Sequence, residues 1–428
     1  MKYRAVKGTR DLLPPESERF AATEAVAREV FGSYGYAEIR TPVLESTDLF
    51  ARSVGETTEL VHKEMYTFPD RKGRSLTMRP ENTAGVVRAL VEHGVQELPK
   101  PIRLWYAGPQ FRYEQPQAGR YREFHQIGAE LIGVASVAAD IELLGMLFVF
   151  LRRLGYERIR ARINCVPTGA AREAFSQALR DSLRPHAGRF GPDDQRRLEQ
   201  NPLRLFDSKD PEVQALLKEA PRSLDFLDAK AAAHHAELKR RLPESGVDFF
   251  EDSTLVRGLD YYTLTVFEVT SGSLGAQDAI LGGGRYDNLF AELGGPPMPA
   301  VGFAIGEDRL VAAAPNDPRR ERPLIAVVPD SPDEFSYAIA ISSEIRACRP
   351  DAVVETDWAG RGIAKGLGRA AQALNDSSRR RASSVHAVLL GGRERENGTV
   401  TVKDLASGEQ KTFPRKNLAE ELGAARES

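Results

Sequence analysis

The segment from Ile102 to Val134 constrains the fold of this chain most strongly, because it contains two long strand-like runs on either side of a polar turn. The runs are IRLWYAGPQFRYE and REFHQIGAELIGV, and the turn contains PQAGR. Two strands joined by a short turn pair in the antiparallel direction. The segment therefore predicts an antiparallel hairpin with a charged tip.

Arginine and glutamate side chains are concentrated between Gln110 and Glu130, where aliphatic residues are scarce. A solvent-exposed hairpin would explain this composition, and so would a site that grips a charged ligand. Strands hold side chains rigidly, and the arginine fork matches phosphate and carboxylate groups. We favour a binding site for a charged substrate.

The remaining sequence up to Ala313 mixes three-to-four spacing of apolar residues, which predicts helices, with alternation, which predicts strands. Between Pro167 and Pro243 helical spacing prevails, so we expect a helical insertion there, with His234 and His235 exposed to solvent. The other expected helices are 18–35, 83–95 and 140–156, and the expected strands are 37–47, 64–70, 75–81, 247–252, 259–272, 281–290 and the start of 299–313.

A proline-rich, charged stretch without periodicity begins at Pro315 and predicts a linker. Beyond it, strand and helix patterns alternate, which predicts a small α/β domain with a partly parallel sheet. The basic run SSRRRASS from Ser377 is expected to be a mobile loop. The expected elements are strands 324–329, 353–356 and 385–392, helices 334–348 and 362–375, and a closing hairpin over 399–413.

Charge and cysteine content exclude several classes of protein. The 428 residues include 61 acidic and 59 basic side chains, so the net charge gives no indication of a nucleic-acid partner. Cys165 and Cys348 are far apart and outside C-x-x-C spacing, so we expect no disulfide framework and no metal site of the zinc type. The run from Leu143 is too short to span a bilayer, and no apolar leader is visible. We expect a soluble cytoplasmic protein.

Short motifs of several common catalytic sites are absent from the chain, namely G-x-x-x-x-G-K-[ST], H-E-x-x-H, G-x-S-x-G and G-x-G-x-x-G after a strand. What remains are arginines in strand-associated motifs that also contain glycine, tyrosine or glutamate. One such arginine alone is more often part of a surface ion pair, but together they favour an anion-binding cleft. The arginines in these motifs are Arg79, Arg112, Arg120, Arg122, Arg257, Arg285 and Arg309.

Carboxylates and tyrosines accompany these arginines. Glu81, Glu114 and Glu130 could each hold an ammonium group, a divalent cation or an imidazole, or could pair with a neighbouring arginine. Spacing alone does not decide between ligand binding and an ion pair with arginine. Tyr261 and Tyr262 are adjacent in an expected strand, so one should point into the core and the other into a pocket.

These segments together resemble the signature blocks of bacterial histidyl-tRNA synthetases, which are class II aminoacyl-tRNA synthetases. TPVLE, FRYE and GFAIGEDR are similar to class II motifs 1, 2 and 3, and RGLDYY and GGGRYD to the two histidine-specific blocks. Further blocks are KGTRDLLP, KEMYTF, TMRPENTAGVVRALVEHG, NPLRLFDSKD and GTVTVKDLASGEQ. In family order they run from near residue 7 to beyond residue 410, so the resemblance covers nearly the whole chain.

The resemblance implies an α+β fold. An antiparallel-sheet catalytic domain would occupy residues 1–318, with the helical insertion at about 168–243, and an α/β anticodon-binding domain would occupy 323–428. It also implies a homodimer built through motif 1. The implied reaction joins histidine to ATP as histidyl-adenylate, with Mg²⁺ on the polyphosphate, and then transfers histidine to tRNA.

Site residues are implied by matching position. Arg112 and Arg257 would act on the α-phosphate, Arg309 would grip the γ-phosphate, and Glu114 would lie near the nucleotide. Glu81 and Thr83 would receive the histidine ammonium, and Glu130 and Tyr262 would read the ring nitrogens. The surrounding residues would be Arg120, Gln126, Tyr261 and Tyr286.

The chain departs from the family pattern at several positions. Gln115 stands where arginine is common, Asp308 where glutamate is, Asn82 where glycine is, and Leu264 where a polar or basic residue is frequent. These departures bear on affinity and leave the implied site residues intact. The DSSRRRASS stretch resembles an insertion in the anticodon-binding domain.

Two alternative interpretations of the resemblance remain. One is the synthetase-like regulatory subunit of ATP phosphoribosyltransferase, a binding protein that typically lacks the anticodon-binding domain and has eroded arginine motifs. The other is a class II synthetase for proline or threonine, against which RGLDYY and GGGRYD argue.

Overall fold

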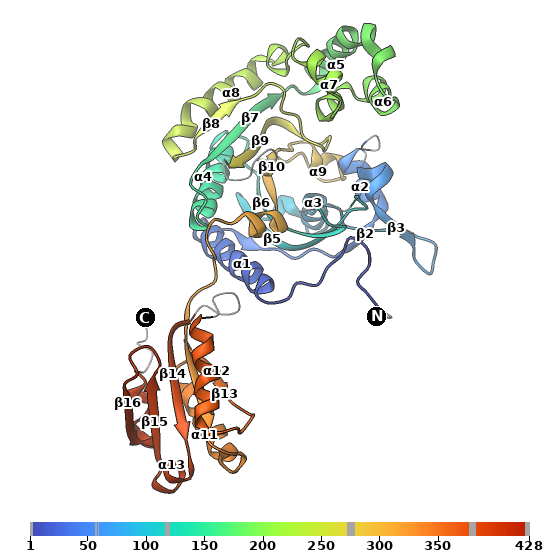
Figure 1. Ribbon diagram of the computed structural model, residues 1–428. Coiled ribbons are helices and arrows are strands. Elements are labelled where there is room, and N and C mark those ends of the chain that lie inside the picture. Colours follow the sequence, from blue (N-terminus) through green and yellow to red (C-terminus); the bar gives the residue numbers. More distant parts are fainter. Residues whose placement is uncertain are drawn as a thin grey trace. The chain divides into compact units, whose positions relative to one another are not determined.

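The computed structural model describes residues 3–55, 58, 60–115, 120–271, 279–375 and 382–423. The chain divides into two compact units (Figure 1). The first comprises residues 1–11 and 23–318, and the second comprises 12–22 and 319–428. Within the described ranges, no helix is both long enough and apolar enough to cross a membrane.

An eight-stranded sheet, counted over the described residues, forms the centre of the first unit in the order β1-β5-β6-β11-β10-β9-β7-β8. All neighbours from β5 to β7 pair antiparallel, whereas β1 and β8 at the edges run parallel to theirs. The strands are β1 Ala37–Glu38, β5 Ile102–Phe111, β6 Glu123–Ile132, β7 Ile159–Val166, β8 Phe249–Glu251, β9 Thr263–Ser271, β10 Ala279–Arg285 and β11 Ala300–Gly306. The antiparallel sheet predicted from the sequence is confirmed.

The predicted hairpin is β5 and β6, paired from Ile102 opposite Ile132 to Phe111 opposite Glu123. Side chains alternate between the two faces of a strand. On β6, Ile127, Ala129 and Leu131 therefore enter the main hydrophobic core, together with the helices α1 (Glu16–Ser33) and α4 (Ala138–Arg153). The residues between them, including Glu130, face the opposite side, where the candidate site lies.

The expected strand 37–47 is wrong as a single element. The structure has β1, which joins the large sheet, and β2 (Leu44–Ser46), which joins a separate three-stranded sheet in the order β2-β4-β3, with β3 Tyr66–Pro69 and β4 Ser75–Met78. Pro42 lies between them and cannot donate a ladder hydrogen bond. Helices α2 (Thr47–Val54) and α3 (Thr83–Glu92) follow β2 and β4.

Residues between β7 and β8 are helical, as predicted, with α5 Gly169–Leu183, α6 Pro192–Gln200, α7 Pro211–Leu217 and α8 Ala229–Arg241. They enclose a small core of their own that includes Phe175, Leu179 and Leu205. The expected exposure of His234 and His235 is wrong. His235 is only 5% exposed, and His234 Nε2 lies 3.0 Å from Thr265 Oγ1 of β9. Both histidines lie on α8, which packs on β7 and β9.

The second unit contains a five-stranded sheet, counted over the described residues, in the order β13-β12-β14-β15-β16. β12 is parallel to β13 and β14, and the last two strands are antiparallel, so the predicted α/β arrangement is confirmed. The elements are β12 Arg322–Pro329, α11 Phe335–Cys348, β13 Val353–Thr356, α12 Ile363–Asn375, β14 Ala382–Leu390, α13 Gly392–Asn397, β15 Thr399–Asp404, β16 Gln410–Pro414 and α14 Leu418–Glu421. Most of the SSRRRASS loop prediction falls on 376–381, outside the described residues.

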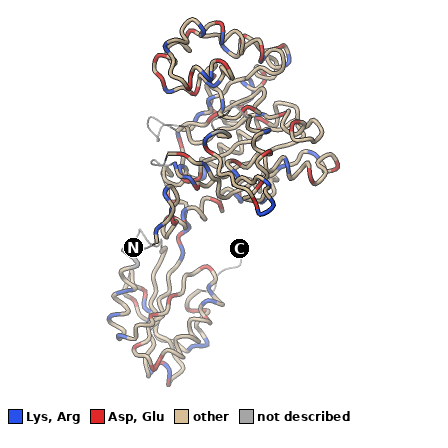
Figure 2. Tube along the Cα trace, turned by 90° about the vertical axis from the view of Figure 1, so that its right-hand side faces the viewer, with Lys and Arg blue, Asp and Glu red and all other residues tan. Residues whose placement is uncertain are grey.

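Charges of both signs are interspersed along the chain trace of each unit (Figure 2). This distribution agrees with the near-zero net charge. A concentration of one sign must therefore be sought locally, in a cavity.

Candidate active site

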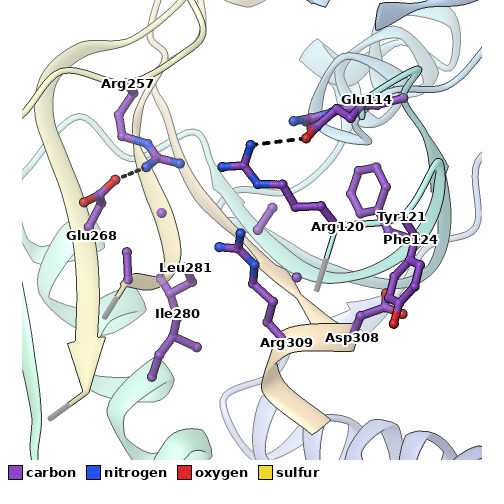
Figure 3. A pocket seen from close by; sticks show the side chains of 15 residues that line it. Glu114, Arg120, Tyr121, Phe124, Arg257, Glu268, Ile280, Leu281, Asp308 and Arg309 are labelled. Carbon is purple, nitrogen blue, oxygen red and sulfur yellow. Dashed lines mark hydrogen bonds and ion pairs between the residues drawn. The ribbon is translucent and has the colours of Figure 1, made fainter. Parts of the chain in front are cut away.

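An arginine-lined cleft lies over the large sheet of the first unit, with a volume of ≈ 360 Å³. Arg120, Arg257 and Arg309 direct their guanidinium groups into the same space (Figure 3). The lining comes from β6, β9, β10, β11, α10 (Glu307–Ala313) and the connections beside them. The polar lining residues are Arg112, Glu114, Arg120, Tyr121, Arg257, Glu268, Asp308 and Arg309.

Arg112 and Arg257 are held firmly by their surroundings. Arg112 Nε donates to the carbonyl of Pro80 (2.9 Å), and its guanidinium lies 5.3 Å from the ring centre of Phe124. Arg257 Nη1 donates to Glu268 (2.5 Å), whereas the bond from Arg120 to Glu114 is long at 3.4 Å (Figure 3). Guanidinium groups that face the same cleft form a site for an anion with several charged groups.

The far wall of the cleft is formed by the start of α10. Burial, and then the charge of Arg120, lowers the pKa of Arg309. Asp308 accepts bonds from Arg10 Nη2 (2.8 Å) and from the backbone N–H of His125 (2.7 Å). The aspartate that departs from the family pattern thus joins the N-terminal segment to β6.

A smaller cavity of ≈ 140 Å³ lies beside the cleft. Its wall shares Arg112 and Arg257 with the cleft, and its character is otherwise different. Carboxylates and phenols, instead of further arginines, complete its polar lining. The remaining polar and aromatic lining residues are Glu81, Thr83, Gln126, Glu130, Tyr261, Tyr262, Tyr286 and Phe303. This cavity is called the pocket below.

Glu130 is the central carboxylate of the pocket and is 0% exposed. It accepts hydrogen bonds from Tyr286 (2.7 Å), Thr83 (2.9 Å) and Tyr106 (3.3 Å). Burial, with Glu81 adding a like charge, raises the pKa of Glu130 to about 8. A carboxyl group poised in this range can accept or donate a hydrogen bond near neutral pH.

Glu81 lies at the N-terminus of α3. Its two oxygens accept from the backbone N–H groups of Thr83 (2.7 Å) and Ala84 (2.9 Å), where the helix leaves donors without partners. Burial raises the pKa of Glu81 as well. The pocket thus contains two buried carboxyl groups that a cationic ligand would stabilise in their charged form.

Two glycines allow this packing. A Cβ atom on Gly302 would lie 1.6 Å from Glu130 Oε2, and one on Gly282 would lie 2.1 Å from the Arg257 guanidinium. Both charged groups therefore rest directly on the sheet, where only glycine leaves room.

The structure brings the predicted site residues together on these two cavities. Arg112 and Arg257 line both, while Glu114 and Arg309 line the cleft. Arg120 also lies on the cleft, although the resemblance placed it with the histidine-binding residues. The pocket contains the other predicted histidine-binding residues, which are Glu81, Thr83, Gln126, Glu130, Tyr261, Tyr262 and Tyr286.

Three of the seven arginines singled out in the sequence do not line either cavity. Arg79 donates to the carbonyls of Thr41 and Pro109. Arg285 and Asp140 are both 0% exposed and form an ion pair of 2.5 Å. Arg122 packs over the ring of Tyr113 at 3.9 Å. These arginines stabilise the fold around the site.

The expectation that Tyr261 and Tyr262 point to opposite faces is wrong. Both line the pocket, with ring centres 4.8 Å apart. They precede β9, which begins at Thr263, so strand alternation does not govern them. Sequence reasoning also missed Tyr106, Phe124 and Glu268. Tyr106 could have been found from its register opposite Gly128 on the face of β6 that carries Glu130.

Comparison with known proteins gives a consistent result. A family model described as Histidyl-tRNA synthetase matches residues 8–310. The histidine–tRNA ligase of Thermosynechococcus vestitus is 43% identical over 423 residues, which cover 98% of this chain and 96% of that protein. The chain belongs to the histidyl-tRNA synthetase family.

Solved structures of the family give the same fold. Apo histidyl-tRNA synthetase from S. aureus is 33% identical, with a TM-score of 0.78 over 98% of this chain and 99% of that one. A protein from Bacillus halodurans C, described as an ATP phosphoribosyltransferase regulatory subunit/histidyl-tRNA synthetase, is 24% identical, with a TM-score of 0.64 over 91% of this chain and 99% of that one. At that identity the second likeness shows the fold alone.

Proposed function

We propose that this chain ligates histidine to tRNA, with the pocket holding histidine and the cleft holding ATP. Histidine–tRNA ligation is the activity named for the curated relative that this chain matches over nearly its full length. One observation carries the assignment of the two cavities: Arg112 and Arg257 line both. The histidine carboxylate and the α-phosphate must meet at such a junction.

Histidine fits the pocket by its chemistry. Its ammonium group would face Glu81 and Thr83, and its ring nitrogens would face Glu130 and Tyr262. The ionised Glu130 can accept an N–H, and a tyrosine hydroxyl can donate to the other nitrogen. A pocket that pairs both nitrogens discriminates strongly, because an amino acid without them leaves buried polar groups unpaired.

The triphosphate fits the cleft because its charge matches the converging guanidinium groups. Arg309 would hold the γ-phosphate, and Arg112 and Arg257 the α-phosphate. A carboxylate oxygen of histidine would then form a bond to the α-phosphorus while the bond to the β-phosphate oxygen breaks, releasing pyrophosphate. Two anions must approach each other in this step, so fixed cations lower its barrier by positioning and charge stabilisation.

Mg²⁺ is expected to arrive with ATP. No group of three or more metal-binding side chains occurs among the described residues, and Mg²⁺ commonly takes one or two carboxylates together with phosphates and water. Glu114 fits that requirement, because it lines the cleft and its bond to Arg120 is long. The ion would neutralise charge on the polyphosphate.

The remaining steps involve larger partners. A hydroxyl of the terminal ribose of tRNA would take histidine from the adenylate, forming an ester and releasing AMP. Residues 323–428 would bind the anticodon. A homodimer would form through motif 1, which contains Leu44 of β2. Leu44 is 47% exposed, and Phe68 of β3 in the same small sheet is 41% exposed. Exposed apolar side chains on one small sheet favour an interface. The catalytic domain would span 1–318, with its helical insertion at about 168–243.

The function is tested by ATP–pyrophosphate exchange with each amino acid in turn. Exchange that depends on histidine alone supports the proposal. Histidine binding without exchange would contradict it and would favour the regulatory-subunit reading. Transfer is then tested by charging tRNA, which should weaken with rising salt because phosphate contacts release counterions.

A further inference from the structure

The connection between β8 and β9 carries ligand-facing residues of both cavities. Arg257 lines the cleft and the pocket, and Tyr262 lines the pocket. Among the described residues, the segment from Val256 to Tyr262 forms one main-chain hydrogen bond. It joins the Asp260 N–H to the Val54 carbonyl (3.2 Å). A segment outside the sheet ladder needs other partners for its polar groups. Those partners decide where Arg257 and Tyr262 point.

Arg204 supplies two of these partners from the helical insertion. Its Nη1 donates to the main-chain carbonyl of Arg257 (2.9 Å), and its Nη2 donates to Asp260 Oδ1 (2.7 Å). The Arg204 side chain is only 11% exposed. Asn201, three residues earlier, donates to the same Asp260 oxygen (3.0 Å). The guanidinium therefore bridges the segment from Arg257 to Asp260.

A second arginine of the insertion supports the end of the same connection. Arg172 on α5 donates from Nη1 to the main-chain carbonyl of Tyr262 (3.0 Å). The carbonyls of the two ligand-facing residues are thus each held by an arginine from outside the sheet. Arg204 and Asn201 belong to the NPLRLFDSKD block, for which the sequence suggested no role.

Arginine suits this position because its planar fork donates to a carbonyl and a carboxylate at the same time in a fixed geometry. Lysine would keep the charge but would lose that geometry. Replacing the fork should move Arg257 relative to the α-phosphate, and displacements of about 1 Å can cost about 100-fold in rate.

We propose that Arg204 is a positioning residue for histidine activation, acting through the main chain of Arg257 and through Asp260. The inference rests on the proposed function. Arg204 itself lines neither the cleft nor the pocket. It couples the helical insertion to Arg257, the residue that would face the α-phosphate.

The test compares Arg204→Ala and Arg204→Lys in histidine-dependent pyrophosphate exchange. We expect Arg204→Ala to lower kcat by about 10- to 100-fold and to change KM for histidine and KM for ATP by smaller factors, because Arg257 lines both cavities. Arg204→Lys should be intermediate. Arg189→Ala is the matched control, because Arg189 lies in the same insertion and forms an exposed pair with Glu212. It should leave the kinetics unchanged.

A double-mutant cycle separates positioning from general support of the fold. If Arg204 acts through Arg257, the variant with both replaced by alanine loses no more activity than Arg257→Ala alone, whereas independent losses multiply. Multiplying losses, or normal kinetics in Arg204→Ala, would overturn the inference. If Arg204→Ala does not fold, the same cycle is run with Arg204→Lys. Wild-type protein is assayed first. If the wild type shows no histidine-dependent exchange, that result contradicts the proposed function, and it is thereby distinguished from a failure of the inference about Arg204.

Discussion

The cleft and the pocket share two arginines and differ in nearly everything else. The cleft is larger, and its arginines face an open space, with carboxylates of the lining beside them. The pocket is small and contains buried carboxyl groups bonded to hydroxyl and backbone donors. One face of a sheet can therefore carry two adjoining cavities of opposite character, because the charge in each cavity is set by local side chains.

Arg257→Ala should have the largest effect, because it removes a charge from both cavities. We expect pyrophosphate exchange to fall by about 100- to 1,000-fold, as for other positioned transition-state donors. The measurement is exchange at saturating histidine and ATP. Arg257→Lys should retain part of the activity, and near-normal exchange in the alanine variant would show that this arginine does not act on the α-phosphate.

Glu130→Gln should affect the pocket and spare the cleft. We expect KM for histidine to rise by about 10- to 100-fold, the range for losing a hydrogen bond to a charged partner, with KM for ATP unchanged. Exchange kinetics as a function of each substrate give both values. Glu212→Gln, on an exposed carboxylate of the insertion, is the control. An equal rise in both KM values would contradict the separation of the two cavities.

The stability of the empty protein should depend on pH through Glu130. Its pKa of about 8 lies above the unfolded value, so between pH 5 and 8 the folded state binds a proton that the unfolded state releases. The free energy of unfolding therefore falls as pH rises, by up to about 1.4 kcal/mol per pH unit. Urea unfolding of wild type and Glu130→Gln measures this, and the variant should lose that part of the slope. Parallel curves for the two proteins would contradict the assignment.

Phe124→Leu should have the smallest effect and should act mainly on the cleft, which Phe124 lines. The Phe124 ring supports Arg112 at 5.3 Å, a contact worth about 0.5–1 kcal/mol at a partly exposed site. KM for ATP should rise by a few-fold, and KM for histidine should rise by less. A larger change in the histidine value would mean that Arg112 belongs chiefly to the pocket.

Much of the fold could be predicted because it depends on local patterns. Alternation predicted the β5–β6 hairpin, and it also explains why Glu130 faces away from the main core. The resemblance supplied the site residues, and the structure gathers them on two adjoining cavities.

What could not be predicted depends on partners far apart in sequence. Arg285 resembles the cleft arginines locally, but its partner Asp140 lies 145 residues away and fixes it in the interior. His234 looks solvated on a polar helix until α8 packs on β9. Tyr261 and Tyr262 precede their strand, and Arg204 and Arg172 reach that connection from the insertion. Only the assembled fold shows these contacts.

The central claim is that histidine and ATP occupy separate cavities that meet at Arg112 and Arg257. A crystal structure with histidine and a non-hydrolysable ATP analogue tests it most directly. We predict the imidazole ring against Glu130 and Tyr262, the triphosphate among the cleft arginines, and the carboxylate facing the α-phosphate between the two shared arginines. An imidazole bound in the cleft, or a triphosphate outside it, would contradict the account.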